Sequence, residues 1–106
     1  MTVLDKYKGT EIGKIPQASE KQMDDAIVAA NKAFEITKKW SAGKRAAMMQ
    51  KVYDLLAAEK VKFIDLIINE GGKPRSYATA EIERSLTTLK LAIEEATRYG
   101  GEVVPM

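Results

Sequence analysis

The sequence predicts a mainly α-helical chain with a short β element near each end. Three stretches carry apolar residues at the i, i+3, i+4 and i+7 spacing that places them on one face of a helix. Two of these stretches end at paired glycines, Gly71-Gly72 and Gly100-Gly101, which suit the left-handed residue that commonly ends a helix. We therefore expect three amphipathic helices over about residues 20–39, 42–70 and 75–99.

The first β element is expected between residues 3 and 16. Two short runs that contain apolar residues flank a turn around Gly9, where the absence of a Cβ gives the backbone the freedom that a turn needs. Pro16 ends the second run because proline cannot donate a hydrogen bond to a sheet. The pattern predicts a hairpin or an extended arm.

The first helix begins with a capping box at Ser19 and Gln22. In that motif the serine hydroxyl accepts from the backbone of the third helical residue, whose side chain accepts from the serine backbone. Apolar residues then follow at helical spacing: Met23, Ala26, Ile27, Ala30 and Phe34.

Ser41 is a candidate cap for the second helix, and Pro74 suits the first turn of the third. Glu59 and Lys60 interrupt the apolar stripe of the second helix, so we expect a kink or a short break there. Residues 102–105 are expected to begin a strand that continues into a part of the fold beyond this chain.

Composition excludes several functions. The chain has no cysteine and no histidine, so it offers neither a thiolate nucleophile nor an imidazole base. Seventeen basic and fifteen acidic residues give a net charge of only +2, which does not indicate a nucleic-acid binder. No apolar run is long enough for a membrane span or a signal peptide, so we expect a cytoplasmic protein.

Residue patterns alone indicate no catalytic, cofactor-binding or closed metal site. The run Gly9–Lys14 lacks the glycine spacing of a phosphate-binding loop, and neither Ser nor Thr follows its lysine. The adjacent carboxylates Asp24-Asp25 and Glu94-Glu95 point about 100° apart on a helix and cannot share a proton or a metal.

The order of motifs nevertheless resembles the beginning of the NAD(P)-dependent aldehyde dehydrogenases. The resemblance covers nearly all of the chain, although Asp5-Lys6 stands where many members have Asn-Pro. The segments that carry it are Gly9–Pro16, Ala18–Trp40 with its Ala29–Phe34 run, Arg45, Val52–Leu56, Asn69–Pro74, Glu81–Arg84 and Tyr99–Pro105.

This resemblance implies a fragment of the α/β aldehyde dehydrogenase fold. Residues 1–106 would be the N-terminal helical part of the coenzyme-binding domain, with the catalytic domain absent. The longer parent would oxidise an aldehyde to a carboxylic acid through a cysteine thiohemiacetal, with NAD or NADP as cofactor. The fragment would be an inactive scaffold whose partner is the rest of the dehydrogenase chain.

The resemblance also suggests roles for two side chains. Arg84 falls where the family's third helix lines the aldehyde entry tunnel, and there it could attract a carboxylate- or phosphate-bearing aldehyde. An ion pair with Glu81 or Glu83 is the alternative. Glu70 aligns with an acidic position that, with main-chain carbonyls near Leu4, holds a monovalent cation in some members. A plain carboxylate at a helix end is the alternative for Glu70.

A second hypothesis is a self-sufficient small helical module that binds a partner protein through its apolar faces. A fragment should expose apolar helix faces and self-associate, and its parent is expected to be a homo-oligomer. An independent module should instead be a cooperative monomer or a defined symmetric oligomer.

Overall fold

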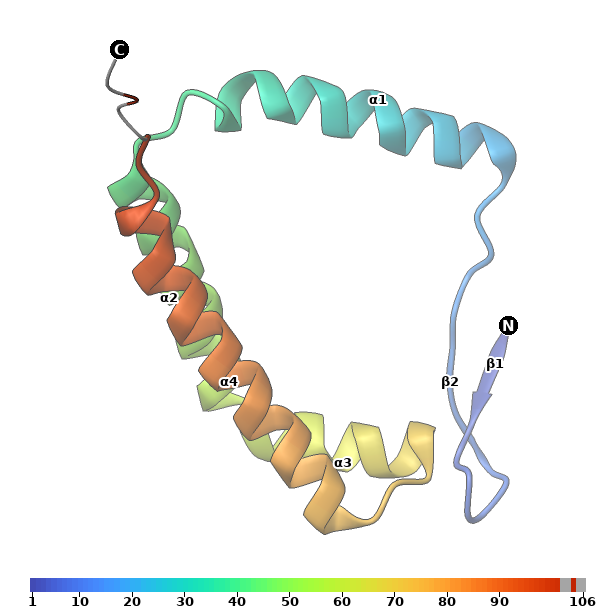
Figure 1. Ribbon diagram of the computed structural model, residues 1–106. Coiled ribbons are helices and arrows are strands. Elements are labelled where there is room, and N and C mark those ends of the chain that lie inside the picture. The colour runs from blue at the N-terminus through green and yellow to red at the C-terminus, as the bar shows by residue number, and fades with distance from the viewer. Residues whose placement is uncertain (102–103, 105–106) are drawn as a thin grey trace.

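The computed structural model of this chain describes residues 1–101 and residue 104. Its elements follow one another around an open frame (Figure 1). Their order along the chain is β1 (Thr2–Leu4), β2 (Glu11–Lys14), α1 (Glu20–Thr37), α2 (Ala42–Ala58), α3 (Lys60–Gly71) and α4 (Arg75–Arg98). The expected strand at residues 102–105 lies outside the described residues, apart from Val104. Across the part of the chain that the structure describes, the helices are too short or too polar to cross a membrane.

The two strands form an antiparallel hairpin, which confirms the predicted N-terminal β element. Thr2 pairs with Lys14, while the register shifts by one residue between Val3 and Leu4. Such a bulge increases the local twist of the ribbon. The turn passes through Gly9, which has the positive φ of 69° that only glycine adopts at little cost.

Helix α1 begins with the predicted capping box. The Ser19 hydroxyl accepts from the backbone N–H of Gln22 at 3.3 Å, and the Gln22 side-chain oxygen accepts from the Ser19 N–H at 2.9 Å. These bonds satisfy two backbone donors that a helix start would otherwise leave unpaired. The helix ends at Thr37, two residues before the expected boundary.

Of the kink or short break expected within residues 42–70, the structure has the break, which divides the stretch into α2 and α3. The break is at the predicted place: Glu59 leaves helical geometry, with φ −100° and ψ 15°. Glu59 and Lys60 interrupt the apolar stripe there, and the Lys60 ammonium pairs with Glu83 of α4. The second of these helices, α3, ends at Gly71 and is capped by Gly72, whose φ of 67° confirms the predicted left-handed glycine. Pro74 precedes α4 as its cap instead of lying in its first turn.

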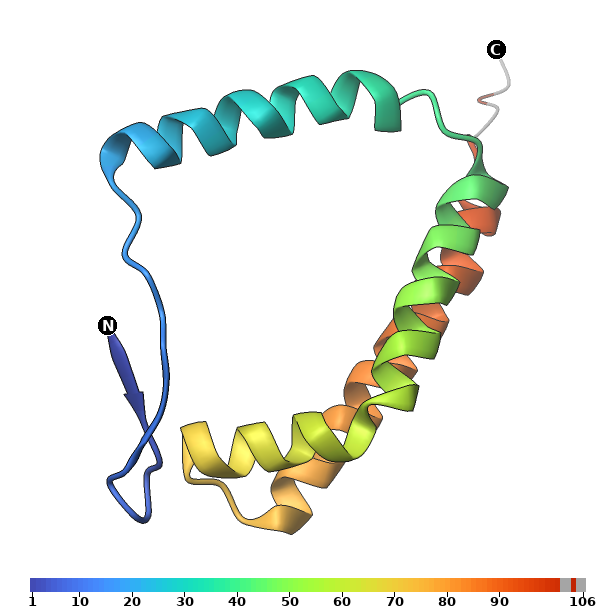
Figure 2. The same cartoon turned by 180° about the vertical axis from the view of Figure 1, so that it is seen from behind.

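The core is small and lies between α3 and α4. Helix α4 runs beside α2 and crosses α3 (Figures 1 and 2). The side chains of Ile64, Ala78, Ile82 and Leu86 are buried there, and the partly buried residues Tyr53, Leu56, Ile67 and Ile68 pack around them.

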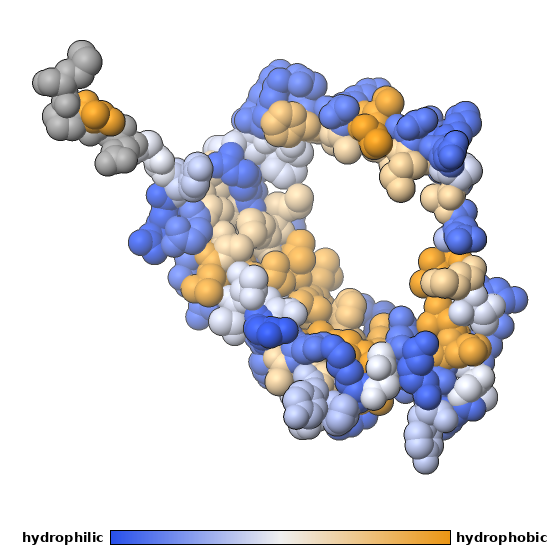
Figure 3. All heavy atoms as spheres, turned by 45° about the vertical axis from the view of Figure 1, so that its right-hand side comes forward, coloured by the Kyte–Doolittle hydropathy of each residue, from blue (hydrophilic) through white to orange (hydrophobic). Residues whose placement is uncertain are grey.

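Helix α1 stands away from this core. Among the described residues it packs against no other helix or strand, and none of its residues is buried. The hairpin returns to α3 through a hydrogen bond from the Lys6 N–H to the Asn69 carbonyl at 3.0 Å. The chain therefore surrounds an opening, which remains open when all atoms are drawn (Figure 3).

Candidate functional site

Arg84 lies on the exposed surface of α4. The two carboxylates that were its expected ion-pair partners are engaged elsewhere: Glu81 pairs with Lys73, and Glu83 pairs with Lys60. Within the described residues Arg84 takes part in no ion pair. Its guanidinium is thus available to an anion that approaches α4 from outside.

Glu70 lies in the last turn of α3 with its side chain exposed. The neighbouring residue, Asn69, accepts the backbone hydrogen bond from Lys6 in the hairpin turn. Leu4 ends the strand that leads into that turn. The fold therefore brings the end of α3 and the end of β1 to one corner of the molecule.

Asp5 organises this corner, and our sequence analysis gave it no role. It is buried, and its carboxylate oxygen Oδ1 accepts from the backbone N–H groups of Lys8 at 2.7 Å and Tyr7 at 2.9 Å. These two hydrogen bonds, that of Lys8 foremost, lower the pKa of Asp5 below its ordinary 3.8, against the opposing effect of burial. The signal that could have identified this turn from the sequence is the Asp itself, because its carboxylate can accept hydrogen bonds from the backbone N–H groups two and three residues later.

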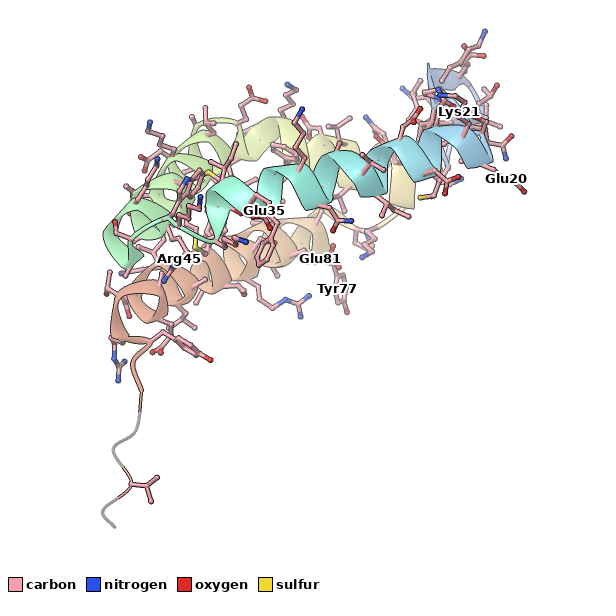
Figure 4. All side chains as sticks on the ribbon, turned by 90° about the horizontal axis from the view of Figure 1, so that it is seen from above. Glu20, Lys21, Glu35, Arg45, Tyr77 and Glu81 are labelled. Carbon is pink, nitrogen blue, oxygen red and sulfur yellow. The ribbon has the colours of Figure 1, made fainter. Side chains whose placement is uncertain are left out.

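An apolar hollow of about 430 Å³ lies at the elbow where α1 joins α2. Arg45, one of its lining residues, donates to the Trp40 carbonyl at 2.7 Å, and the Lys44 ammonium lies 4.8 Å from the centre of the Trp40 ring. Figure 4 shows Arg45 beside the end of α1 that carries Glu35. The hollow is lined by Phe34, Thr37, Lys38, Trp40, Arg45, Met48 and Met49.

The indole N–H of Trp40 is buried without a hydrogen-bond partner among the described residues. A buried donor left unpaired costs about 1–3 kcal/mol, so native proteins rarely keep one. The sequence analysis had treated Trp40 only as the boundary between two helices, because a single tryptophan carries no spacing signal.

Arg84 and Glu70 are exposed charged side chains, and the elbow hollow is lined mainly by apolar side chains. The sequence supplies no cysteine or histidine to act as nucleophile or base.

Comparison with known families gives a match along the whole chain. The model of the aldehyde dehydrogenase family matches residues 1–106. The 3-sulfolactaldehyde dehydrogenase of Priestia aryabhattai is 33% identical over 106 residues, which are 100% of this chain and 22% of that protein.

Solved structures agree with the sequence match. Aldehyde dehydrogenase 21 from Physcomitrella patens, crystallised with the reaction product succinate, superimposes with a TM-score of 0.95 at 34% identity, over 99% of this chain and 22% of the other. The glyceraldehyde-3-phosphate dehydrogenase GapN of Methanocaldococcus jannaschii, complexed with NADP, gives 0.95 at 30% identity, over 100% and 23%. The chain therefore spans about a fifth of the length of these relatives and corresponds to their N-terminal portion.

Proposed function

Because the chain belongs to the aldehyde dehydrogenase family, we propose that it is the N-terminal scaffold of a longer NAD(P)-dependent aldehyde dehydrogenase. The observation that carries this proposal is the close match of the whole open frame to relatives more than four times as long. In the proposed parent, an aldehyde is oxidised to a carboxylic acid with NAD or NADP as the electron acceptor.

The composition indicates which part of the enzyme supplies the nucleophile. This segment has no cysteine, so the nucleophile that attacks the aldehyde must come from the remaining part of the enzyme. The segment would contribute rigid helices on which the rest of the chain packs, and alone it would be inactive. We further propose a cytoplasmic, homo-oligomeric parent, as expected from the sequence.

Arg84 is proposed to attract the anionic end of the substrate. Two observations support this role: the guanidinium is exposed, and neither Glu81 nor Glu83 neutralises it. The relatives described above act on 3-sulfolactaldehyde and glyceraldehyde-3-phosphate or bind succinate, all of which carry an anionic group. Other matching family members are named for the neutral lactaldehyde and benzaldehyde, which serve as comparison substrates.

Glu70 is proposed to bind a monovalent cation together with main-chain carbonyls near Leu4. The contact between Lys6 and Asn69 supports this proposal, because it holds the two parts of the site at one corner. If the proposal is right, potassium raises the melting temperature of the full-length enzyme, and Glu70→Gln removes that increase. An equal potassium effect in both proteins would contradict it, and Asp65→Asn on the same helix is the control for lost surface charge.

The alternative function is a self-sufficient small helical module that binds a partner protein. The exposed apolar side chains of α1 are the observation that favours it. In that case the 106-residue chain is the complete working unit, and it has no part in aldehyde oxidation.

The mass and activity of the native product separate these functions. An antibody raised against this segment would detect a product several times larger than 11.7 kDa, and the purified product would oxidise aldehydes with NAD or NADP. A native product of about 11.7 kDa that has no such activity would overturn the dehydrogenase proposal and favour the binding module.

A further inference from the structure

The two carboxylates beside Arg84 differ in their position relative to it. Glu81 precedes Arg84 by three residues in α4, so the two side chains lie on one face of the helix, about one turn apart. Side chains of a helix lean toward its N-terminus, which turns Arg84 toward the turn that carries Glu81. Glu83 is adjacent to Arg84 in sequence and points about 100° away around the helix. Glu81 is therefore the carboxylate that the helix itself offers to Arg84.

In the structure Glu81 is paired with Lys73 instead of Arg84. Lys73 lies in the loop between α3 and α4, and its ammonium donates to the Glu81 carboxylate. The Glu81 side chain is only 34% exposed, so water screens this pair less than it screens a fully exposed one. Within the described residues Arg84 is then left without an anionic partner, although a carboxylate lies one turn away.

The loop that carries Lys73 is held on both sides. Gly72 precedes it with a left-handed backbone, and a Cβ added to Gly72 would lie 3.1 Å from the Cβ of Lys6 in the hairpin turn. Pro74 follows it with φ fixed at −58° by the proline ring. Because the backbone is already constrained, less conformational entropy opposes the pair of Lys73 with Glu81 than opposes a pair between two mobile surface residues.

We propose that Lys73 is a positioning residue for anionic substrates. It holds the Glu81 carboxylate, so that Arg84 stays unpaired and meets the anionic group of the aldehyde. Without the Lys73 ammonium, Glu81 turns to Arg84 and neutralises it. This inference rests on the proposed function of Arg84, and it gives a lysine outside α4 an effect on the choice between anionic and neutral aldehydes.

Lys73→Met in the full-length enzyme tests the proposal, with Lys60→Met as the matched control. Each variant removes one lysine and releases one glutamate of α4, but only Lys73→Met releases the glutamate that lies on the Arg84 face. Lys73→Met should lower kcat/KM for an anionic aldehyde about two- to fivefold, mainly by raising KM, because exposed helix pairs at this spacing have formation constants of about that size. The value for a neutral aldehyde, and both values in Lys60→Met, should change less than about 1.5-fold.

Removing the released carboxylate as well separates ion pairing from net charge. Lys73→Met combined with Glu81→Gln has the net charge of the unmodified enzyme and lacks the carboxylate that would neutralise Arg84. It should therefore restore kcat/KM for the anionic aldehyde, and Lys73→Arg, which keeps the cation, should not lower it. A loss that persists in the double variant, an equal loss in Lys60→Met, or no loss in Lys73→Met would overturn the proposal.

A crystal structure of the unmodified full-length enzyme provides a second measurement, which does not depend on whether a variant folds. The Glu81 carboxylate should lie within about 4 Å of the Lys73 ammonium and farther than that from the Arg84 guanidinium. A contact between Glu81 and Arg84 in that structure would overturn the proposal.

Arg84→Gln in the same assay separates this inference from the proposed function. If Arg84→Gln selectively lowers kcat/KM for the anionic aldehyde and Lys73→Met does not, the inference about Lys73 alone is wrong. If Arg84→Gln affects anionic and neutral aldehydes equally, Arg84 does not recognise the anionic group, and its proposed function is overturned together with the inference. A full-length protein that oxidises no aldehyde would also overturn both.

Discussion

Arg84 carries a positive charge that the neighbouring carboxylates do not neutralise, because Lys60 and Lys73 already occupy Glu83 and Glu81. Hydrogen bonds to charged groups contribute about 1.5–3 kcal/mol, which corresponds to a change of roughly 10- to 150-fold in a rate or binding constant. We expect Arg84→Gln to lower kcat/KM of the full-length enzyme by that factor for a carboxylate- or phosphate-bearing aldehyde. The value for a neutral aldehyde should change little.

The control for Arg84 is Arg75→Gln, which removes the same charge from an arginine that pairs with Asp65 on α3. Steady-state kinetics with an anionic and a neutral aldehyde of similar size would be measured for both variants. Equal losses for the two aldehydes in Arg84→Gln would show that the residue acts through stability or packing and not through the substrate's charge.

Asp5 makes the stability of the hairpin corner depend on pH. Its pKa is lowered in the folded chain by the N–H groups of Lys8 and Tyr7, so folding favours the ionised carboxylate. The resulting stabilisation is fully present above pH 3.8, the ordinary pKa, and is lost as the pH falls through the lower folded value. Asp5→Asn keeps the side-chain oxygen that the turn needs but stays uncharged at every pH.

Melting temperatures of the unmodified chain and of Asp5→Asn, measured in the full-length enzyme from neutral to strongly acidic pH, would test this. The unmodified protein should be the more stable above pH 3.8, and the difference should shrink toward zero below it. A difference that does not change with pH would mean that the carboxylate charge is not what stabilises the turn.

At the scale of elements, the end of α3 is fixed by one glycine and not by its neighbour. Gly72 has a φ of 67°, and a Cβ added there would lie 3.1 Å from the Cβ of Lys6. A left-handed conformation costs a residue with a side chain about 1–2 kcal/mol, and the contact with Lys6 adds to it, so Gly72→Ala should destabilise the fold. Gly71 is helical, and its added Cβ would be 3.8 Å from the nearest side-chain atom, so Gly71→Ala should be neutral or stabilising by up to about 1 kcal/mol.

Urea unfolding of the two alanine variants in the full-length enzyme would measure this difference. If Gly72→Ala were as stable as Gly71→Ala, the hairpin turn could not lie against the end of α3 as described. The hydrogen bond from Lys6 to Asn69 would then also be in doubt, because it depends on the same close approach.

Local signals predicted most of the elements. The capping box at Ser19, the break near Glu59 and the glycine end of α3 each depend on a few neighbouring residues, so they could be identified without knowledge of the fold. The sequence showed that the apolar stripe was interrupted near Glu59 but not whether the helix would bend or stop there, and the structure has the break. Pro74 was misplaced by one residue, which is within the usual uncertainty of helix ends.

Contacts between distant residues were less predictable. Nothing in the spacing of charges indicated that Lys60 and Lys73 would take the carboxylates beside Arg84, since these lysines lie 23 and 8 residues from their partners. The Trp40 hollow was missed for the same reason: its walls come from α1 and α2, and the angle between those helices sets its shape.

At the scale of the whole molecule, the amphipathic pattern of α1 correctly indicated a helix with a face to bury. It could not indicate that no other described element covers that face. The radius of gyration is 19.0 Å, against about 13 Å for a compact domain of this length. The segment is therefore an open frame, and another part of a protein would have to fill its interior before the fold became compact.

This open frame predicts how the 106-residue chain behaves in isolation. With about 3,000 Å² more exposed surface than a compact protein of its mass, it should self-associate through its apolar faces. Sedimentation velocity from low micromolar to submillimolar concentration should show a mean mass that rises above 11.7 kDa. Ile27→Glu combined with Phe34→Glu should shift that rise to at least about tenfold higher concentration, because charges on the α1 face oppose burial.

The paired control is Val28→Glu combined with Ile36→Glu, which adds the same charge to α1 away from the face defined by Met23 to Phe34. If both double variants changed association equally, net charge and not the α1 face would be responsible. A single 11.7 kDa species at every concentration, unfolding cooperatively, would contradict the open frame itself. It would mean that α1 closes onto its own chain in solution, and it would favour the self-sufficient binding module over a scaffold that is completed by the rest of a dehydrogenase.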